Sequence, residues 1–310
     1  MLGTDASGVY VISATPFTET GALDLASTDR LIDFYRKSGV AGITILGMMG
    51  EAPKLDAAEA ITFTRHVVAR AKGLSVIVGV SSPGFAAMRA LARAGMEAGA
   101  AGVMVAPPSA LKTDDQIVAY YGQASEAMGR DVPFVIQDYP QGTAVFMSVG
   151  AIQRIICDNP SCVMLKAEDW PGLEKISAVR NAEAEGRQRR VSILTGNGGL
   201  FLDFELQRGA DGAMTGYAFP EMLVDLVRLM RDGKGEAGHD LFDAHLPLIR
   251  YEQQPGVGLA VRKYVLKRRG VLASDAQRKP GSSLSPAARD EVELLLSRLA
   301  KKDARAARLV

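Results

Sequence analysis

The stretch GAAGVMVA (residues 99–106) joins a segment with helical spacing to a short apolar run. Its first glycine suits the left-handed conformation that ends many helices, and its second lets the chain turn tightly into a strand. The same helix-to-strand turn recurs as GVAG at residues 39–42 and GADG at 209–212. Three copies of one turn predict a repeated β/α unit.

Short apolar runs rich in Val and Ile recur at fairly even intervals along the chain. They lie at residues 9–14, 43–46, 76–80, 103–106, 134–136, 163–165, 191–194 and, weakly, 213–215. They do not alternate with polar residues, which is typical of buried parallel strands. Segments with helical spacing separate them, among them 57–72, 86–98, 114–128 and 220–231.

Eight such units predict an α/β fold, a (β/α)8 TIM barrel over residues 1–233. Additional C-terminal helices, expected at 236–251, 256–269 and 286–301, would form a helical extension over residues 234–310. A doubly wound open sheet is the alternative fold, because the order of the strands cannot be read from a sequence.

The composition restricts the class of protein. The net charge of +1 gives no indication of a nucleic-acid or membrane partner. Two cysteines do not make a disulfide framework, and the first residues do not resemble a signal peptide, so we expect a cytoplasmic protein. None of the three histidines falls at a predicted strand end. We therefore expect neither a Ser-His-Asp hydrolase nor a metal site, and no cofactor.

Lys166 follows the apolar run 163–165 and so lies at the carboxyl end of a predicted buried strand. Barrel enzymes carry their active sites at that end. A buried lysine is costly unless it has a partner or a role, and a neutral amine can attack a carbonyl group. Simple pairing with Glu168 or Asp169 is the alternative.

Several motifs occur together in one order. They are ATPF at residues 14–17, Gly47-x-x-Gly50-Glu51, the strand of Lys166, Gly196-Asn197 and GADG at 209–212. In this order and spacing the chain resembles the dihydrodipicolinate synthase / N-acetylneuraminate lyase family, from about residue 8 to residue 300. The resemblance implies a class I aldolase-type lyase that breaks carbon-carbon or carbon-oxygen bonds. It also implies a homo-oligomer, a dimer or a tetramer.

In that family a lysine on the sixth strand forms a Schiff base with pyruvate or another 2-oxo acid, and Lys166 matches its position. The reaction would be aldol addition or cleavage, or dehydration. Further residues are expected to bind the substrate. They are Thr15, Gly47, Met48, Met49, Gly50, Gln137, Gly196, Asn197 and Thr215.

The chain departs from the family at Met48 and Met49, where relatives that use pyruvate carry two hydroxyl residues. Methionine donates no hydrogen bond. Backbone N–H groups of this loop can still hold a carboxylate. The methionines suggest a less polar acceptor or a bulkier 2-oxo acid, and ordinary core packing is the alternative.

A second departure lies on the fifth strand. The family's catalytic tyrosine stands three residues before a proline, where this chain has Gln137, and Tyr139 directly precedes Pro140. Side chains two apart on a strand share a face. Tyr139 is therefore a candidate general acid/base, with a lid-packing role as the alternative. Asp138 should point the other way.

The arginine that follows this proline in true dihydrodipicolinate synthases is replaced by Gln141, and the paired tyrosines after the fourth strand are also missing. These losses argue against authentic 4-hydroxy-tetrahydrodipicolinate synthase activity. Two alternatives to a Schiff-base lyase remain. One is a non-catalytic relative that binds a 2-oxo acid. The other is an enzyme that binds a phosphate at glycines 196, 198 and 199 and forms no imine.

Overall fold

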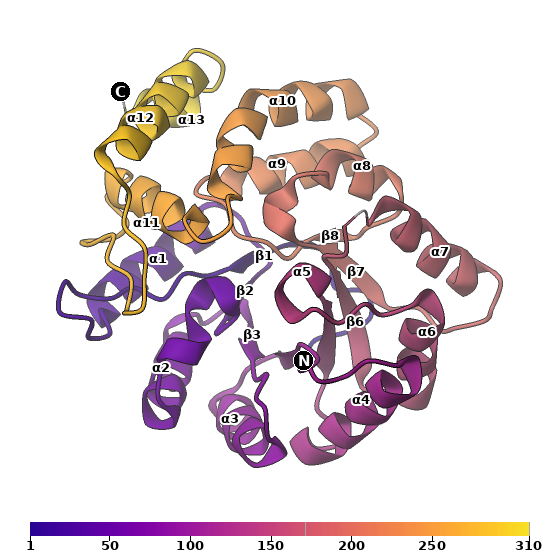
Figure 1. Cartoon of the computed structure of the whole chain (residues 1–310). Coiled ribbons are helices and arrows are strands. Elements are labelled where there is room, and N and C mark those ends of the chain that lie inside the picture. Colours follow the sequence, from indigo (N-terminus) through magenta and orange to yellow (C-terminus); the bar gives the residue numbers. More distant parts are fainter. Residues whose placement is uncertain (171, 310) are drawn as a thin grey trace.

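The computed structural model describes residues 1–170 and 172–309, and eight parallel strands close into a barrel in chain order (Figure 1). The strands are β1 (Gly8–Ile12), β2 (Gly42–Ile45), β3 (Ser75–Gly79), β4 (Gly102–Val105), β5 (Phe134–Asp138), β6 (Cys162–Ala167), β7 (Ser192–Thr195) and β8 (Gly212–Ala213). Because β1 pairs with β8, the sheet has no free edge. The predicted TIM barrel is confirmed, and the doubly wound open sheet is excluded.

Helices connect successive strands on the outside of the barrel (Figure 1). They are α1 (Leu25–Lys37), α2 (Ala57–Arg70), α3 (Phe85–Ala98), α4 (Asp114–Met128), α6 (Val149–Asp158), α7 (Leu173–Ala184), α8 (Leu202–Gln207) and α9 (Pro220–Arg231). The short helix α5 (Pro140–Thr143) lies instead over the mouth of the barrel (Figure 1). Short 3-10 turns follow two strand ends: η1 (Met48–Gly50) and η2 (Ala52–Lys54) come after β2, and η3 (Asn197–Gly199) comes after β7. The predicted helices agree with these bounds to within two residues.

Four more helices follow the barrel. They are α10 (Gly235–Glu252), α11 (Gly258–Arg268), α12 (Pro286–Ala300) and α13 (Ala304–Ala307). They gather on one side of the barrel, beside α9 and α1 (Figure 1). The barrel with additional C-terminal helices is therefore confirmed. A separate helical unit that begins at residue 234 stays a prediction.

The repeated turns have the conformation that the sequence predicts. Gly99 adopts a φ of 101°, the left-handed region, after α3. Gly102 then begins β4, and a Cβ atom there would lie only 2.7 Å from the carbonyl oxygen of Pro133. A side chain would therefore push β4 away from the neighbouring chain segment, which explains why glycine opens the strand.

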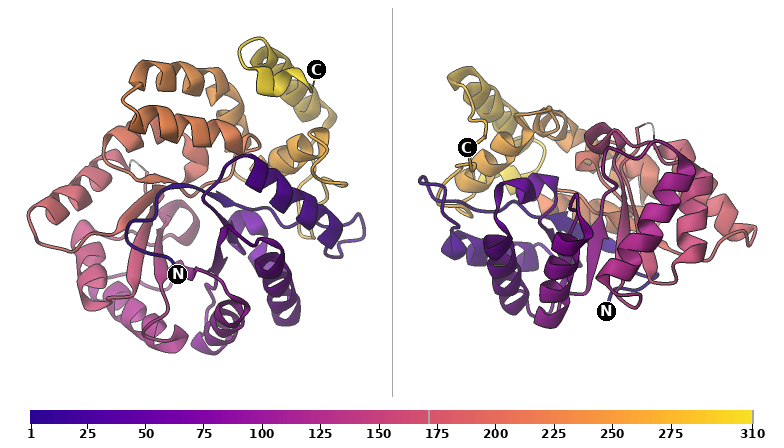
Figure 2. Two further views of the ribbon diagram at one scale, coloured as in Figure 1. Left: turned by 180° about the vertical axis from the view of Figure 1, so that it is seen from behind. Right: turned by 60° about the horizontal axis from the view of Figure 1, so that its bottom comes forward.

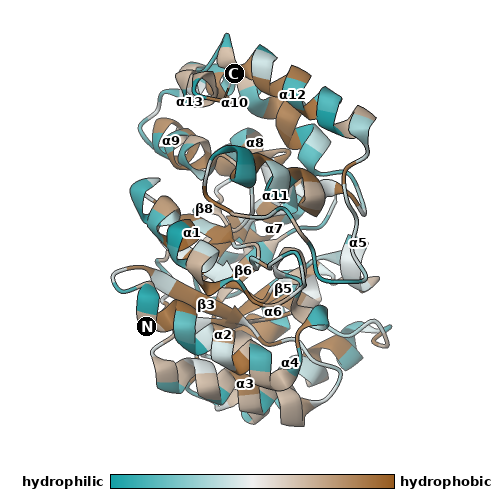
Figure 3. Ribbon diagram, turned by 90° about the vertical axis from the view of Figure 1, so that its left-hand side faces the viewer, coloured by the Kyte–Doolittle hydropathy of each residue, from teal (hydrophilic) through white to brown (hydrophobic). Residues whose placement is uncertain are grey.

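The barrel interior holds a small apolar cluster, which includes Ile77, Met104, Val135 and Met164. Leu2 joins it from the N-terminal segment, which crosses the amino end of the barrel (Figure 2). A larger apolar layer packs between the strands and the surrounding helices, and hydrophobic residues are concentrated along β3 (Figure 3). None of the helices in the described residues is long and apolar enough to span a bilayer. The apolar filling leaves the carboxyl end of the barrel for polar side chains.

Candidate active site

Lys166 stands inside the barrel at the carboxyl end of β6. It lies one rung above Met164 of the interior cluster, because side chains two apart on a strand share a face. Its neighbours across the sheet are Gln137 on β5 and Leu194 on β7. The side chain is only 4% exposed. The strand extends to Ala167, so the lysine lies within the strand, where both neighbours fix its direction.

Glu168 lies beside this lysine. Its Oε2 atom is 2.8 Å from Nζ of Lys166 and accepts a hydrogen bond of 2.8 Å from Nε2 of Gln137. Its Oε1 atom accepts a bond of 3.3 Å from the backbone N–H of Asn197. The side-chain amide of Asn197 donates to the backbone oxygen of Glu168 at 2.8 Å. A buried carboxylate is thus held against the lysine by partners from two neighbouring strand ends, those of β5 and β7.

This ion pair bears on the alternative in which Lys166 has a purely structural role. In that alternative Lys166 only pairs with an acidic neighbour and faces no substrate. In the structure Lys166 does pair with Glu168, but both groups face one cavity. Asp169 does not join them, since it pairs with Lys175 at 2.8 Å. A carboxylate in contact with an ammonium group is also a potential acceptor of its proton. Pairing and catalysis are therefore compatible here.

Gly196 makes room for Glu168. A Cβ atom at position 196 would lie 2.2 Å from Oε1 and 2.4 Å from Cδ of the glutamate. Real Cβ atoms do not approach other atoms so closely, so any side chain at this position would displace the carboxylate. Gly196, one of the predicted binding residues, thus contributes to the site by leaving space for the Glu168 side chain.

A cavity of about 80 Å³ opens at this mouth of the barrel. Its lining consists of Ile12, Met48, Met49, Gln137, Tyr139, Lys166, Glu168, Asn197, Gly198, Thr215, Gly216, Gln253 and Arg262. Seven of the predicted catalytic and substrate-binding residues therefore meet here: Lys166, Tyr139, Met48, Met49, Gln137, Asn197 and Thr215.

Four of the predicted binding residues do not line this cavity: Thr15, Gly47, Gly50 and Gly196. Thr15 is buried, and its hydroxyl group donates to the backbone oxygen of Gly50 at 2.6 Å. The threonine therefore supports the loop from behind. The N–H of Gly50 donates to the oxygen of Gly47 at 3.0 Å and so is used within the turn. Both glycines shape the loop.

The backbone N–H groups of Met48 and Met49 donate to no acceptor in residues 1–170 and 172–309. They remain available for a ligand. The Met49 side chain packs on the interior cluster, whereas the Met48 side chain is 43% exposed. Glu51 anchors this loop, because it is buried in ion pairs with Lys263 and Lys54.

Tyr139 and Gln137 face the same cavity, as their spacing predicts. Burial raises the pKa of the Tyr139 phenol, and the charge of Glu168 raises it further. Asp138 faces away and pairs with Lys175 at 2.7 Å, which agrees with the predicted structural role. Burial raises the pKa of Asp138 to about 6, although Lys175 opposes this effect.

Three polar residues of the site were missed in the sequence: Glu168, which the sequence suggests only as a structural partner of Lys166, and the distant residues Gln253 and Arg262. Gln253 follows α10, and Arg262 lies on α11, far along the chain from the barrel strands. They enter the cavity beside two glycines. A Cβ atom at Gly198 would lie 2.0 Å from Nε2 of Gln253, and one at Gly216 would lie 1.9 Å from Nη1 of Arg262. The space beside Gly198 is therefore filled by protein, which leaves less room there for the phosphate considered above.

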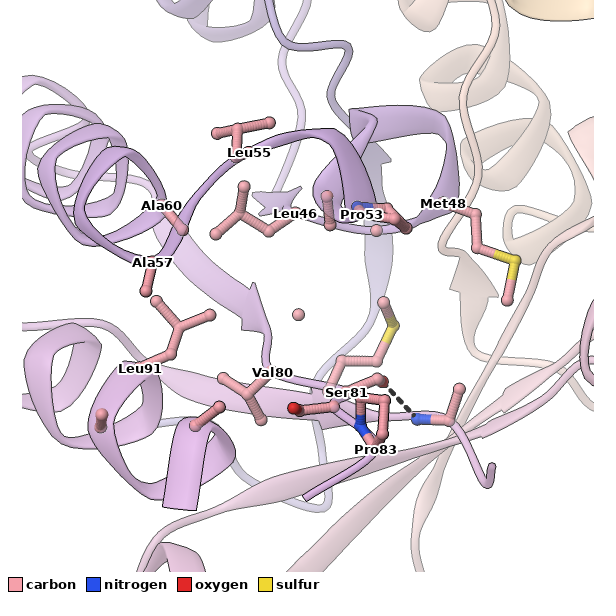
Figure 4. Close-up of a pocket in the computed structure, with 18 of the residues that line it drawn as sticks. Leu46, Met48, Pro53, Leu55, Ala57, Ala60, Val80, Ser81, Pro83 and Leu91 are labelled. Carbon is pink, nitrogen blue, oxygen red and sulfur yellow. Dashed lines mark hydrogen bonds between the residues drawn. The ribbon is translucent and has the colours of Figure 1, made fainter. Parts of the chain in front are cut away.

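A second cavity of about 500 Å³ adjoins the first (Figure 4). It lies between α2, α3 and the carboxyl ends of β2 and β3. Most of its lining is apolar, including Leu46, Pro53, Leu55, Ala57, Ala60, Val80, Pro83, Leu91 and Met104. Met48 and Gln137 border both cavities. An apolar space thus begins next to the polar site.

The three histidines lie elsewhere. His66 contacts Asp29, His239 contacts Asp203, and His245 bridges Tyr217 and Asp303. Within the described part of the chain, no group of three or more His, Cys, Asp or Glu side chains is arranged to hold a metal ion. The titratable groups of the cavity are therefore Lys166, Glu168, Tyr139 and Arg262.

The closed barrel and the polar groups at its mouth define a (β/α)8-barrel enzyme of the lyase class. The sequence model of the Dihydrodipicolinate synthetase family matches residues 5–299, and the chain belongs to this family. The sequence-based resemblance is thereby confirmed.

The relatives of this chain carry the names of different enzymes. The chain is 30% identical over 298 residues to L-2-keto-3-deoxyarabonate dehydratase of Azospirillum brasilense, covering 94% of each chain. It is 31% identical over 221 residues to 4-hydroxy-tetrahydrodipicolinate synthase of Sorangium cellulosum, covering 67% of this chain and 68% of the relative. A crystal structure of dihydrodipicolinate synthase from Rhodopseudomonas palustris is 61% identical, with a TM-score of 0.95 over 96% of this chain and 99% of that chain.

Proposed function

We propose that Lys166 forms an imine with the keto group of a 2-oxo acid, and that Glu168 carries the protons of the reaction. The contact of 2.8 Å between Nζ of Lys166 and Oε2 of Glu168 supports this proposal most directly. Both side chains are buried and both face the cavity. A nucleophile beside a base that other groups hold in place is the usual arrangement for covalent catalysis.

The first half of the reaction needs a neutral amine. Glu168 accepts a proton from the Lys166 ammonium group, and the amine attacks C2 of the substrate. The keto oxygen leaves as water after it has received protons, and a protonated imine remains. This cation withdraws electrons from C3, so a base can remove a C3 proton and leave an enamine.

The second half depends on the substrate. When C4 carries a hydroxyl group, the enamine electrons return through C3 and expel that hydroxyl, which takes a proton from a general acid and leaves as water. When the substrate is an aldol adduct, a base instead removes the proton of the C4 hydroxyl group. The C3–C4 bond then breaks, C4 leaves as an aldehyde, and the bond electrons form the enamine of the shorter 2-oxo acid, which takes up a proton at C3 to give the imine. Hydrolysis of the imine releases the product and restores Lys166.

Dehydration of a sugar-derived 2-oxo acid is the favoured reaction. The methionines at 48 and 49 offer no hydroxyl relay, whereas Glu168 lies where the protonated imine would form. The dehydratase of Azospirillum brasilense, a relative over 94% of each chain, acts on a 2-keto-3-deoxy sugar acid by its name. Gln141 supports the same preference, because it stands where dihydrodipicolinate synthases carry the arginine for the aldehyde substrate. Its side-chain amide lies 2.8 Å from the backbone oxygen of Glu168 and 3.0 Å from the backbone N–H of Trp170. It is therefore engaged by the backbone.

The adjoining apolar cavity would leave room for a bulkier 2-oxo acid. We further propose a cytoplasmic homo-oligomer, a dimer or a homotetramer, that needs neither a cofactor nor a nucleic-acid or membrane partner. Size-exclusion chromatography with light scattering measures the oligomeric state directly.

Borohydride reduction in the presence of pyruvate and a panel of other 2-oxo acids tests the mechanism. The intact mass should increase by one reduced adduct, and peptide mapping should locate it on Lys166. Lys166→Ala should give no adduct and lose at least ~10³-fold in turnover, since it removes the nucleophile. Lys37→Ala, at an exposed lysine, is the control and should react normally.

An unchanged mass would contradict the imine, and full activity of Lys166→Ala would favour the phosphate-binding alternative. A non-catalytic relative would be stabilised by pyruvate without exchanging its methyl protons. Deuterium uptake into the pyruvate methyl group would exclude that alternative, because this exchange requires the enamine.

A further inference from the structure

We propose that Arg262 binds the carboxylate of the 2-oxo acid through its Nη1 group. This assignment rests on the proposed function, since it gives Arg262 a role in the same site. Arg262 would be the group that recognises the negative charge of the ketone substrate. The sequence alone indicates the backbone of the loop at 47–51 for this task.

The guanidinium group is deeply buried but not fully bonded. Arg262 is 2% exposed and borders the cavity that contains Lys166. Its Nε atom donates to Glu252, and its Nη2 atom donates to the backbone oxygen of Gly216 at 2.7 Å. Nη1 is buried and has no acceptor within the described residues. A buried charged donor without an acceptor is unfavourable, so a ligand oxygen at this point would be stabilising.

The backbone fixes where Nη1 lies. It occupies the place of the missing side chain of Gly216, 1.9 Å from where a Cβ atom would be. The same hypothetical Cβ would lie 2.9 Å from the oxygen of Ile12, so the guanidinium sits where the ends of β8 and β1 meet. Glu252 is itself buried and also accepts from the N–H of Ala218 at 3.2 Å. Two fixed acceptors therefore hold Arg262 in one orientation.

The side-chain donors on the strands beside Lys166 are already used, and the backbone N–H groups of Met48 and Met49, which are free within the described residues, carry no charge. Nε2 of Gln137 and Nδ2 of Asn197 both donate to Glu168. Lys166 is assigned to the imine. Met48 and Met49 have no side-chain donors. The N–H groups of an arginine are charged donors that bind carboxylate oxygens well. Arg262 thus supplies the charged donor that the methionines cannot.

The test compares two ketones that differ in one charge. Pyruvate carries the carboxylate and methyl pyruvate does not, and borohydride trapping on Lys166 measures both. The variant Arg262→Met/Glu252→Gln removes both buried charges, so neither is left unpaired. Half-maximal trapping should then need roughly 10- to 100-fold more pyruvate, while the concentration of methyl pyruvate needed should stay the same.

A second variant, Gly216→Ala, tests the assignment even if Arg262→Met/Glu252→Gln does not fold. Gly216→Ala should displace Nη1 and raise the pyruvate requirement alone, with Glu252 still present. Glu252→Gln by itself retains the arginine and should retain the preference for pyruvate. An unchanged pyruvate requirement in both Arg262→Met/Glu252→Gln and Gly216→Ala, or an equal rise for both ketones, would overturn the assignment. Failure of the unmodified protein to trap either ketone would instead contradict the imine itself.

Discussion

Oε2 of Glu168 lies 2.8 Å from Nζ of Lys166, and Glu168 directly follows β6, two positions after the lysine. Lys166 points into the barrel from within β6, and hydrogen bonds from Gln137 and Asn197 hold Glu168 beside it. A single short segment therefore supplies both the nucleophile and its base, and the surrounding strands need only hold them. The following substitutions separate these roles.

Glu168→Gln should separate imine formation from proton transfer. The amide keeps the size of the side chain but cannot accept a proton from Lys166. Turnover should fall by ~10²- to 10⁴-fold, the usual contribution of a general acid/base. Steady-state kinetics on a 2-keto-3-deoxy sugar acid measures this loss. Asp169→Asn is the matched control, because that carboxylate pairs with Lys175, and its activity should stay within a few-fold. Equal activity of both variants would exclude Glu168 as the proton carrier.

Gly196→Ala should have a similar effect without touching a reactive group. The added methyl group would collide with the Glu168 carboxylate and move it off Lys166. Turnover should fall by about 10²-fold, while borohydride trapping still occurs. Gly122→Ala is the control. This glycine lies within α4 with open space around it, so alanine should leave activity unchanged and stabilise the fold by ~0.5–1 kcal/mol. Retained turnover in Gly196→Ala would show that the position of Glu168 is not critical.

Tyr139→Phe tests the predicted proton shuttle against a packing role. The ring stays in place between the cavity and Gly142, where a Cβ atom would touch the phenol ring. If the hydroxyl group transfers a proton, kcat should fall by at least ~10²-fold while the pyruvate concentration for trapping is unchanged. A loss only in Tyr139→Ala, with Tyr139→Phe fully active, would assign the residue to packing.

Glu205 should make stability depend on pH. It lies on α8, is 7% exposed, and burial raises its pKa to about 8, with Oε2 lacking a partner in the described residues. A raised pKa in the folded state means that this protein binds the proton more tightly than the unfolded chain does. The stabilisation is complete below the unfolded pKa of about 4.5 and is lost as the pH rises through about 8.

Glu205→Gln should therefore resemble the protonated acid at every pH. The variant and the unmodified protein should have similar free energies of unfolding at pH 5, and the variant should be more stable at pH 8 by a few kcal/mol (~1.4 kcal/mol per pH unit). Urea unfolding at both pH values measures the difference. Glu236→Gln, at an exposed glutamate, should show no such change. A difference that does not vary with pH would contradict the burial effect.

The sequence was most informative where a side chain lies on a regular strand. Buried runs predicted the eight strands, and alternation placed Gln137 and Tyr139 on one side of β5 with Asp138 on the other. Loops have no such period, so the sequence could not tell that Thr15 supports Gly50 from behind.

The distant residues of the site had no local signal. Arg262 stands in a helix with several other basic residues, and only the closed structure brings it beside Gly216. The sequence did point to Gly196 and Gly198, but as direct contacts for a ligand. Their actual contribution, space for Glu168 and Gln253, depends on partners that contact them only after folding.

The cavity lining combines residues from the first strand of the barrel with residues that follow the last strand. Ile12 belongs to the first strand, and Gln253 and Arg262 come after the last one. A nascent barrel that has emerged from the ribosome only as far as β8 would possess Lys166 and Glu168 and yet have an open, incomplete chamber. Because the chain is synthesised from its N-terminus, the active site is complete only after nearly the whole polypeptide has been made. Truncations that remove the helices after the barrel should therefore abolish activity even where the sheet still closes.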